Sequence, residues 1–463
     1  MAAPEYSIVL DIVGLETEHL ESGLVPNIAR LAGAGEYAKM EPVFPAVTCT
    51  VQASLLSGRY PSEHGIVANG LYDRSTYSVS FWEQPSSLVR AERVWDRRRR
   101  MQQKGHGEAG PSTTTTTTAA ATAVLFWQNT MYADADIVVT PRPIHLDDGM
   151  VMWCYSKPVG YYDEELKESL GEFDLASYWG PLASPRSSEW IARAAEYTLE
   201  KKRPDQLFVY IPHVDYSAQR FGRSDMRVRD DLKKADEIVG RLVQKTKELG
   251  IGDRTQFVIV SEYSFNDVDG AVPLNLALRD AGLLAVRDIQ GKEYLDFEFS
   301  KAFAMVDHQV AHIFVQDARS EKEARKVLEA TKGVDRVLGA EEKKTLRIDH
   351  ERSGELVAVA ERNKWFSYYW WYDGENKAPS FARRVDIHRK PGYDPVELFF
   401  DAKTRSIPLD ASLVRGSHGR PPDLETGEGL SFYASNRKHG VANSSGVARC
   451  TDIISKCLLP PGA

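Results

Sequence analysis

The chain has 463 residues, of which 42% are hydrophobic and 27% are charged, a composition typical of globular proteins with more than one domain. Its formal net charge of −8 argues against a broad nucleic-acid-binding surface, which needs clustered lysine and arginine. Four cysteines without a CxxC pair argue against a disulfide scaffold. No apolar run reaches the roughly 18 residues of a membrane span, and no leader pattern opens the chain. The sequence therefore predicts a cytoplasmic protein.

Short apolar runs alternate with amphipathic helical patterns in the first part of the chain. Strands are expected at 6–13, 122–128, 206–213 and 256–263, and helices at 187–203 and 231–250. Buried strands that alternate with helices predict an α/β fold with a largely parallel central sheet flanked by helices. In such sheets, ligands bind beyond the carboxyl ends of the strands.

The pattern of apolar and polar residues changes along the chain and suggests where its domains begin and end. Residues 301–339 read as strand, helix and strand, and the apolar setting of His308 and His312 favours structural roles for both. We expect the first part of the α/β core at 1–270, with a low-complexity Thr/Ala insertion at 104–121 and a cap-like segment at 141–187. A small α+β insertion follows at 271–385. The chain returns to the core at 386–463, and this last part carries His418.

Polar side chains follow several of the predicted strands. Asp11 closes the first strand, Asp215 follows the third, and Glu262 and Tyr263 end the fourth. Singly, each acid is most often a turn former or a helix cap. Because parallel strands bring their carboxyl ends to one edge, we expect these groups to converge on an oxygen-rich site for a hard or borderline cation. His418, flanked by small residues in "GSHGRPPD", is the histidine expected there.

Thr48 stands at the predicted start of a helix in "FPAVTCTVQASLLSGRYPSEHG". It is either a simple helix cap or a nucleophile. The backbone N–H groups and the positive dipole end of that helix favour an anionic substrate, and a metal would lower the pKa of the threonine hydroxyl. This combination predicts phosphoryl or sulfuryl ester chemistry.

The block "FPAVT … SLLSGRYPSEHGI" resembles the nucleophile motif of the alkaline phosphatase superfamily, and in particular of the type I phosphodiesterase/nucleotide pyrophosphatase family. The resemblance implies an alkaline-phosphatase-like core with an inserted cap and a small α+β subdomain. It also implies a threonine nucleophile, here Thr48, between two divalent metal ions, usually zinc. Asp11, Asp215 and His418 match the family's metal ligands.

Three positions depart from the ligand pattern that the resemblance implies. Glu262 replaces an aspartate, Tyr263 a histidine, and Gln219 the histidine of an Asp-x-x-Gly-His motif, in which Ala218 also replaces glycine. The chain thus resembles a divergent branch of the family. Oxygen ligands in place of nitrogen shift the expected metal from zinc toward manganese, magnesium, calcium or iron.

Other blocks, among them "SEY", "FWQN", "HLDDGM" and "KPGYDP", resemble a bacterial-type group of phosphodiesterase-like proteins often encoded beside prenyltransferase and sugar-isomerase genes. The resemblance implies a small phosphorylated metabolite, of the nucleotide or prenyl-linked kind, as the substrate and no nucleic-acid polymer as a partner. Gln52, His145 and Asp148 are weaker candidates for substrate contact.

The leading prediction is a metal-dependent phosphoric ester hydrolase that uses Thr48 as its nucleophile. Two alternatives remain open. One is a metal-poor relative without catalysis that binds a phosphorylated ligand or a partner. The other is a metal enzyme of altered reaction type that works through a Glu262/Tyr263 metal site.

Overall fold

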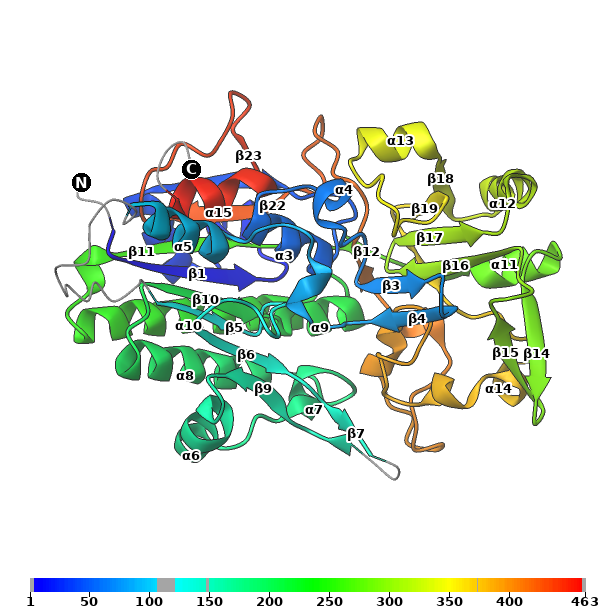
Figure 1. The fold of residues 1–463 in the computed structure, drawn as a ribbon, viewed down its shortest axis with the longest axis horizontal. Helices are drawn as coiled ribbons and strands as arrows, with labels where there is room; N and C mark the ends of the chain where they lie inside the picture. The colour runs from blue at the N-terminus through cyan, green and yellow to red at the C-terminus, as the bar shows by residue number, and fades with distance from the viewer. Residues whose placement is uncertain (1–3, 106–120, 147–149, 373, 460–463) are drawn as a thin grey trace.

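A nine-stranded sheet forms the centre of the computed structural model, which describes residues 4–105, 121–146, 150–372 and 374–459. Figure 1 shows this sheet in the left half of the molecule. Its strands lie in the order β23 (Val447–Arg449), β2 (Glu36–Glu41), β22 (Ser431–Ser435), β11 (Thr255–Val260), β1 (Tyr6–Ile12), β10 (Gln206–Ile211), β5 (Thr122–Leu125), β6 (Ile137–Pro141) and β9 (Cys154–Lys157).

The middle of this sheet is parallel, which confirms the predicted fold class. β1 pairs in parallel with β10 and with β11, and β10 pairs in parallel with β5. In β10 and β11 every residue is buried, as expected for strands that helices cover on both faces. All four predicted strands are present, although β5 ends at Leu125 and β11 at Val260, each three residues before the predicted end.

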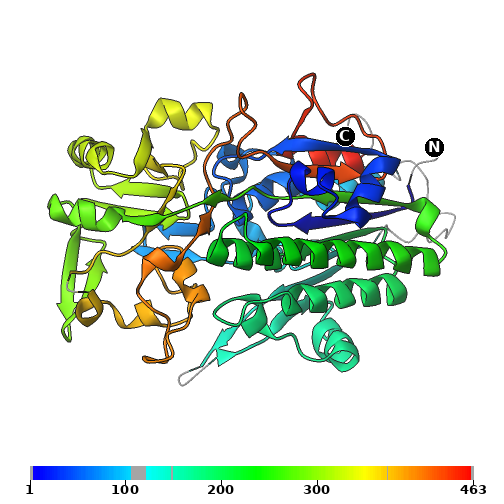
Figure 2. The same cartoon turned by 180° about the vertical axis from the view of Figure 1, so that it is seen from behind.

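Two groups of helices cover the faces of the sheet. α8 (Arg186–Lys201) and α10 (Met226–Glu248) run side by side along one face (Figure 2) and correspond to the two predicted helices. The other group contains α3 (Thr48–Ser57), α5 (Val94–Gly105) and α15 (Cys450–Leu458) (Figure 1). Of the predicted insertion at 104–121, residues 106–120 lie outside the described residues.

A second, four-stranded antiparallel sheet lies at the other end of the molecule (Figure 1). Its strands lie in the order β16 (Ala302–Asp307), β17 (Val310–Val315), β19 (Leu356–Ala360) and β18 (Val334–Leu338). α11 (Leu274–Asp280), α12 (Ala318–Ala330) and α13 (Ala340–Thr345) accompany it, and the hairpin of β3 (Gly70–Asp73) and β4 (Ser78–Phe81) lies between the two sheets. The first strand predicted in 301–339 is in fact a tight hairpin, because the chain turns at His308 with φ +60°.

A buried ion triad holds part of the segment that leads back to the core. The Lys390 ammonium lies 2.7 Å from a carboxylate oxygen of Asp394 and 2.7 Å from one of Glu397, and all three side chains are almost completely buried. A buried charge needs such partners, since an unpaired one would lose its hydration without compensation. Lys390 therefore has a structural role here.

His312 on β17 ties the second sheet to the core. Its Nε2 donates to the carbonyl of Val67 at 3.0 Å, and its Nδ1 accepts the Gly354 N–H at 3.1 Å. Both ring nitrogens are thus occupied by the neutral imidazole, and burial lowers the pKa of His312 to about 4. The structure confirms the structural role predicted for this histidine.

No helix among the described residues is long and apolar enough to cross a membrane.

This arrangement predicts a loss of stability in mild acid. The folded-state pKa of His312 is about 4 and its unfolded value is about 6.5, so the unfolded chain takes up the proton first as the pH falls. The free energy of unfolding should drop between pH 6.5 and 4, by about 2 kcal/mol at pH 5 from this residue alone.

Urea unfolding at pH 7 and pH 5 measures this drop. His312→Leu should be less stable at pH 7 but should lose about 2 kcal/mol less than the wild type between the two pH values. An unchanged pH dependence in His312→Leu would contradict the assignment.

Candidate active site at the carboxyl edge of the central sheet

Two acids from neighbouring strands meet at the edge of the central sheet, as predicted. Asp11 lies in β1 opposite Val260 of β11, and Glu262 follows β11 two residues later. Both side chains have no exposed surface. Gln52 on α3 joins them, because its Nε2 donates to Asp11 Oδ2 at 3.0 Å and to Glu262 Oε1 at 2.6 Å.

The orientation of the Gln52 amide is fixed by the backbone. The N–H of Gln128 donates to Gln52 Oε1 at 2.7 Å, and a backbone N–H can only donate. The amide nitrogen of Gln52 must therefore face the two carboxyl groups. Gln52, a weak substrate-contact candidate in the sequence, instead organises the acidic pair.

The surrounding protein offers the acidic pair no basic partner. Among the described residues, neither Asp11 nor Glu262 forms an ion pair with lysine or arginine, and Asp11 Oδ1 and Glu262 Oε2 lack hydrogen-bond partners. Burial raises the pKa of both carboxyls, and the neighbouring Asp11 raises that of Glu262 further. Two buried orphan oxygens beside the Thr48 hydroxyl fit one hard cation, which prefers carboxylate and hydroxyl oxygens.

Thr48 is the first residue of α3, and the cap position falls on Val47, so Thr48 is not the simple helix cap that was one interpretation of the sequence. Its hydroxyl begins a chain of hydrogen bonds. Thr48 Oγ1 lies 3.0 Å from the Tyr263 hydroxyl, which donates to Asp215 Oδ1 at 3.4 Å. Asp215 Oδ2 in turn accepts from Gln219 Nε2 at 2.7 Å, and Tyr393 donates to Gln219 Oε1 at 3.0 Å. Burial raises the pKa of Asp215 to about 7 and that of the Tyr263 phenol well above its usual value.

His418 lies beside this chain of hydrogen bonds. Its Nδ1 donates to the Ala46 carbonyl at 2.8 Å, so Nε2 carries the lone pair and lies 3.9 Å from Asp215 Oδ1. Its ring stacks on Tyr263, with ring centres 3.5 Å apart and planes at 6°. The structure thus brings together Asp11, Thr48, Asp215, Gln219, Glu262, Tyr263 and His418.

The second cation expected from the resemblance does not fit these donors. Gln219 places its amide N–H on Asp215, where an imidazole lone pair would be needed. Tyr263, expected beside Glu262 as a ligand of the first cation, keeps its phenolic proton. Within the described ranges, no three or more His, Cys, Asp or Glu side chains are grouped to hold a metal ion, which applies to Asp11 and Glu262 as well as to Asp215. The Asp215 half of the site is therefore a hydrogen-bonded unit.

His308 is a residue of this site that the sequence interpretation missed. It stands at the tip of the β16–β17 hairpin, where its φ of +60° is unusual for a residue other than glycine. Its ring lies 3.8 Å from the rings of both Tyr393 and His418, and its Nδ1 lies 2.7 Å from Asp307 Oδ1. A tripeptide Asp-His-Gln between two β-branched apolar runs was the only sequence signal for such a turn.

The remaining candidates lie away from these groups or cannot be placed. Cys49, next to Thr48, is buried, and burial raises its thiol pKa, which makes it a poor nucleophile. His145 belongs to the short strand β7 (Ile144–His145). Asp148 lies outside the described residues.

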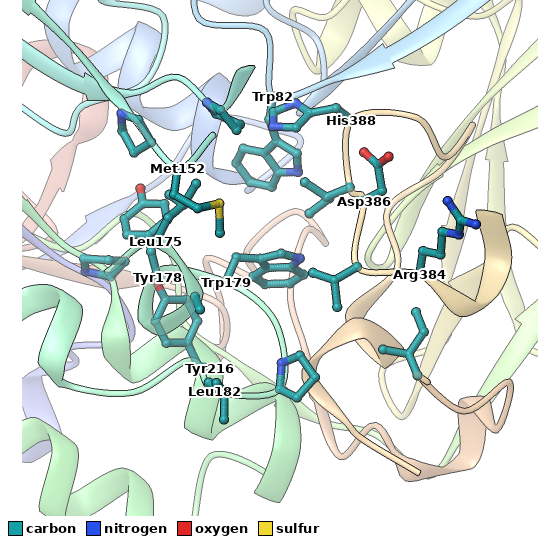
Figure 3. A pocket seen from close by; sticks show the side chains of 18 of the residues that line it. Trp82, Met152, Leu175, Tyr178, Trp179, Leu182, Tyr216, Arg384, Asp386 and His388 are labelled. Carbon is teal, nitrogen blue, oxygen red and sulfur yellow. The ribbon is translucent and has the colours of Figure 1, made fainter. Parts of the chain in front are cut away.

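A cavity of about 970 Å³ opens above Thr48 and Asp215. Its walls come from the segment around α7 (Leu175–Tyr178), from α9 (His213–Phe221) and from the segment after η4 (Ser380–Arg383). Figure 3 shows Met152 and Leu175 on one side of this cavity and Arg384 and Asp386 on the other. The site therefore has space for a substrate directly over the threonine hydroxyl.

The sequence and the fold identify the family. Residues 7–394 match the type I phosphodiesterase/nucleotide pyrophosphatase family, and the chain belongs to this family. Phosphonoacetate hydrolase from Sinorhizobium meliloti 1021 has a similar fold, with a TM-score of 0.61 and 18% identity over 98% of this chain and 95% of that one. Murine ectonucleotide pyrophosphatase/phosphodiesterase 5 is also similar, with a TM-score of 0.59 and 14% identity over 98% and 95% of the two chains. The alkaline-phosphatase-like fold is thus confirmed.

Curated relatives match a part of the chain. Ectonucleotide pyrophosphatase/phosphodiesterase family member 1 of Rattus norvegicus is 24% identical over 266 residues, which is 56% of this chain and 24% of that protein. A bis(5'-adenosyl)-triphosphatase of Mus musculus is 24% identical over 261 residues, 55% of this chain and 46% of that protein. The chain spans about a quarter to a half of the length of these relatives.

Gln52 provides a test of how the site is assembled. In Gln52→Leu, Asp11, Glu262 and the Gln128 N–H each lose a buried hydrogen bond. At about 1 kcal/mol or more for each group left unsatisfied, the free energy of unfolding should fall by about 3 kcal/mol, as measured by urea unfolding at pH 7.5. Gln244→Leu on the exposed face of α10 should change it by less than about 0.5 kcal/mol. Equal stability of the two variants would show that Gln52 does not hold the acidic pair.

Proposed function

We propose that the protein is a phosphoric ester hydrolase in which Thr48 attacks phosphorus. One observation carries the proposal: a threonine hydroxyl at a helix N-terminus opens into a cavity and is linked through Tyr263 to Asp215. Membership of a family of phosphodiesterases and pyrophosphatases supports it. The substrate is a small phosphorylated compound, of the nucleotide or prenyl-linked kind expected from the sequence.

The hydrogen bonds give the nucleophile a route for its proton. As Thr48 Oγ1 bonds to phosphorus, its proton passes to the Tyr263 oxygen while the Tyr263 proton passes to Asp215 Oδ1. The P–O bond to the leaving alcohol breaks, and that alkoxide takes a proton from water. Asp215, whose pKa of about 7 lies near neutrality, suits this acid–base role.

Water then completes the turnover. Its oxygen attacks the phosphothreonine and gives up a proton to the hydroxide that the first step left in solution. The bond between Thr48 Oγ1 and phosphorus breaks, and the proton held on Asp215 returns through Tyr263 to the threonine oxygen. The positive end of α3 favours the negative charge of the phosphoryl group throughout. Tyr263 thus has the task of a proton relay, which explains why a phenol with a high pKa suits this position.

Asp11, Glu262 and the Thr48 hydroxyl would hold a single hard cation. When bound, the cation would polarise a phosphoryl oxygen and favour the ionised threonine. The two divalent ions expected from the family resemblance, with zinc as the usual metal, become one ion of the magnesium or manganese type in this proposal. The oxygen donors at Asp11 and Glu262, and the hydrogen bond that occupies Asp215, support that choice.

A binding protein without catalysis is the second candidate. The observation that favours it is the Gln219 amide on Asp215, which occupies the position of a metal ligand with a hydrogen-bond donor. Such a protein would bind the phosphate at the start of α3 and release it unchanged. The threonine experiment below separates the two functions.

Thr48→Ala should abolish hydrolysis. With bis(p-nitrophenyl) phosphate as the substrate, we expect kcat/KM to fall by about 10³-fold or more, because the nucleophile is lost. Thr48→Ser should keep part of the activity, and an acid quench of the wild type should trap phosphate on Thr48, detected by peptide mass spectrometry. Thr404→Ala, at an exposed threonine, is the matched control. Full activity in Thr48→Ala would exclude the mechanism, and an inactive wild type that binds phosphate would favour the binding protein.

Cation binding should have a stoichiometry of one. Titration calorimetry with Mn²⁺ or Mg²⁺ should give one site per chain, with an affinity at least about tenfold weaker in Glu262→Gln. His418→Ala should keep the site, because the histidine lies on the Asp215 side. Glu341→Gln, at an 83% exposed side chain, controls for surface charge. Two tightly bound zinc ions per chain, or no binding at all, would contradict the proposed site.

A further inference from the structure

The cavity over Thr48 has mainly apolar walls. Trp82, Met152, Leu175, Trp179, Tyr216 and Ile407 contribute to its lining, and proline residues fill the gaps between them. Figure 3 shows Trp82, Met152, Leu175 and Trp179 around the cavity. Burial in such walls stabilises an aliphatic group in proportion to its length.

The amide groups in the wall are already paired. Gln84 Nε2 donates to Gln128 Oε1 at 2.6 Å, and Gln84 Oε1 accepts from the Thr140 hydroxyl at 3.2 Å. The Gln128 amide nitrogen in turn donates to the Tyr178 hydroxyl at 3.4 Å. A nucleobase is recognised by hydrogen bonds to its edges, whereas these hydrogen bonds of the two glutamines go to neighbouring side chains.

The aromatic rings of the wall are arranged edge to face. The Trp179 ring meets Tyr393 at 48° and Tyr216 at 72°, and the Trp82 ring meets Tyr393 at 61°. Tilted rings of this kind bury each other's faces. They present an irregular apolar wall, which a flexible chain follows more readily than a flat base.

The mouth of the cavity is also apolar. Among the residues that line it, Leu182 is 71% exposed, Phe400 59%, Val385 41% and Met152 38%. Large apolar side chains gathered at one opening usually mark a binding surface. Arg384 and Arg405 stand at the same opening and, among the described residues, form no ion pair with an acid. Their charge attracts an anionic substrate.

We propose that the cavity binds the aliphatic chain of a phosphate ester, with the phosphate at Thr48 and the chain extending along Trp82 and Trp179 toward Leu182 and Phe400. The proposal rests on the function proposed above, because it places the phosphate at the nucleophile. A linear alkyl chain and a branched isoprenoid chain share the chemistry that these walls recognise. A nucleotide does not.

Binding to the Thr48→Ala chain separates substrate class from catalysis. Titration calorimetry with butyl, hexyl and octyl monophosphate, each below its micelle concentration, should show an affinity that rises about 100-fold from butyl to octyl, or about three- to fourfold per methylene. Adenosine monophosphate should bind more weakly than octyl phosphate. Geranyl phosphate distinguishes an isoprenoid substrate from a linear alkyl substrate. Tighter binding of geranyl phosphate than of octyl phosphate indicates an isoprenoid chain, and weaker binding indicates a linear alkyl chain. A flat series, or tighter binding of the nucleotide, would overturn the proposal.

A variant that fills the cavity provides a second test of where the aliphatic chain binds. In the Thr48→Ala background, Met152→Trp should cut the affinity for octyl phosphate at least about tenfold, because the larger ring occupies the space of several methylenes. Met226→Trp introduces the same ring at a 68% exposed methionine on α10 and should leave the chain-length series unchanged. Equal effects of the two variants would overturn the assignment of the cavity.

The outcomes also distinguish this proposal from the proposed hydrolase. A steep chain-length series in a wild type that never hydrolyses an ester supports the ligand class and rejects catalysis. Hydrolysis by Thr48 with kcat/KM independent of chain length supports the hydrolase and rejects the aliphatic substrate.

Discussion

Two carboxyl groups buried side by side are the constraint on which the site depends. Asp11 and Glu262 leave adjacent parallel strands at the same edge, and neither reaches solvent. Buried like charges repel each other, so the fold has to supply donors, a proton or a cation. Gln52 supplies the donors, and its own orientation depends on the backbone of the chain that follows β5. The nucleophile helix, the sheet edge and the segment after β5 are thereby fixed relative to one another.

The second half of the site is held by stacked rings. The order is Tyr393, His308, His418 and Tyr263, with neighbouring ring centres 3.8, 3.8 and 3.5 Å apart. Each ring comes from a different part of the chain, and His308 comes from the second sheet. The stack joins the core and the second sheet at the site. His418 is held at its Nδ1 by a carbonyl and at its faces by Tyr263 and His308.

The sequence contained the parts of this site that follow from regular structure. Asp11 and Glu262 could be predicted because strand ends converge in a parallel sheet, and Thr48 because a helix start follows a motif that resembles a known family. Gln52 was a candidate for substrate contact, and its position four residues after Thr48 places both on the same helix face. His308 could not, because its position depends on a left-handed turn and on the packing of a distant sheet. Neither leaves a periodic pattern.

Tyr263 connects these observations. A histidine at this position would offer a metal a neutral nitrogen, whereas the phenol offers the threonine a hydrogen-bond partner and donates to Asp215. Such a relay works best when the acceptor titrates near neutrality, and a buried aspartate without a cation does so because burial raises its pKa. A second cation would lower that pKa and remove the acceptor. Tyr263 and Gln219 both place hydrogen-bond donors on Asp215, where the resemblance implies metal-binding nitrogens, and this is the physical basis of the proposed relay and of the proposed single cation.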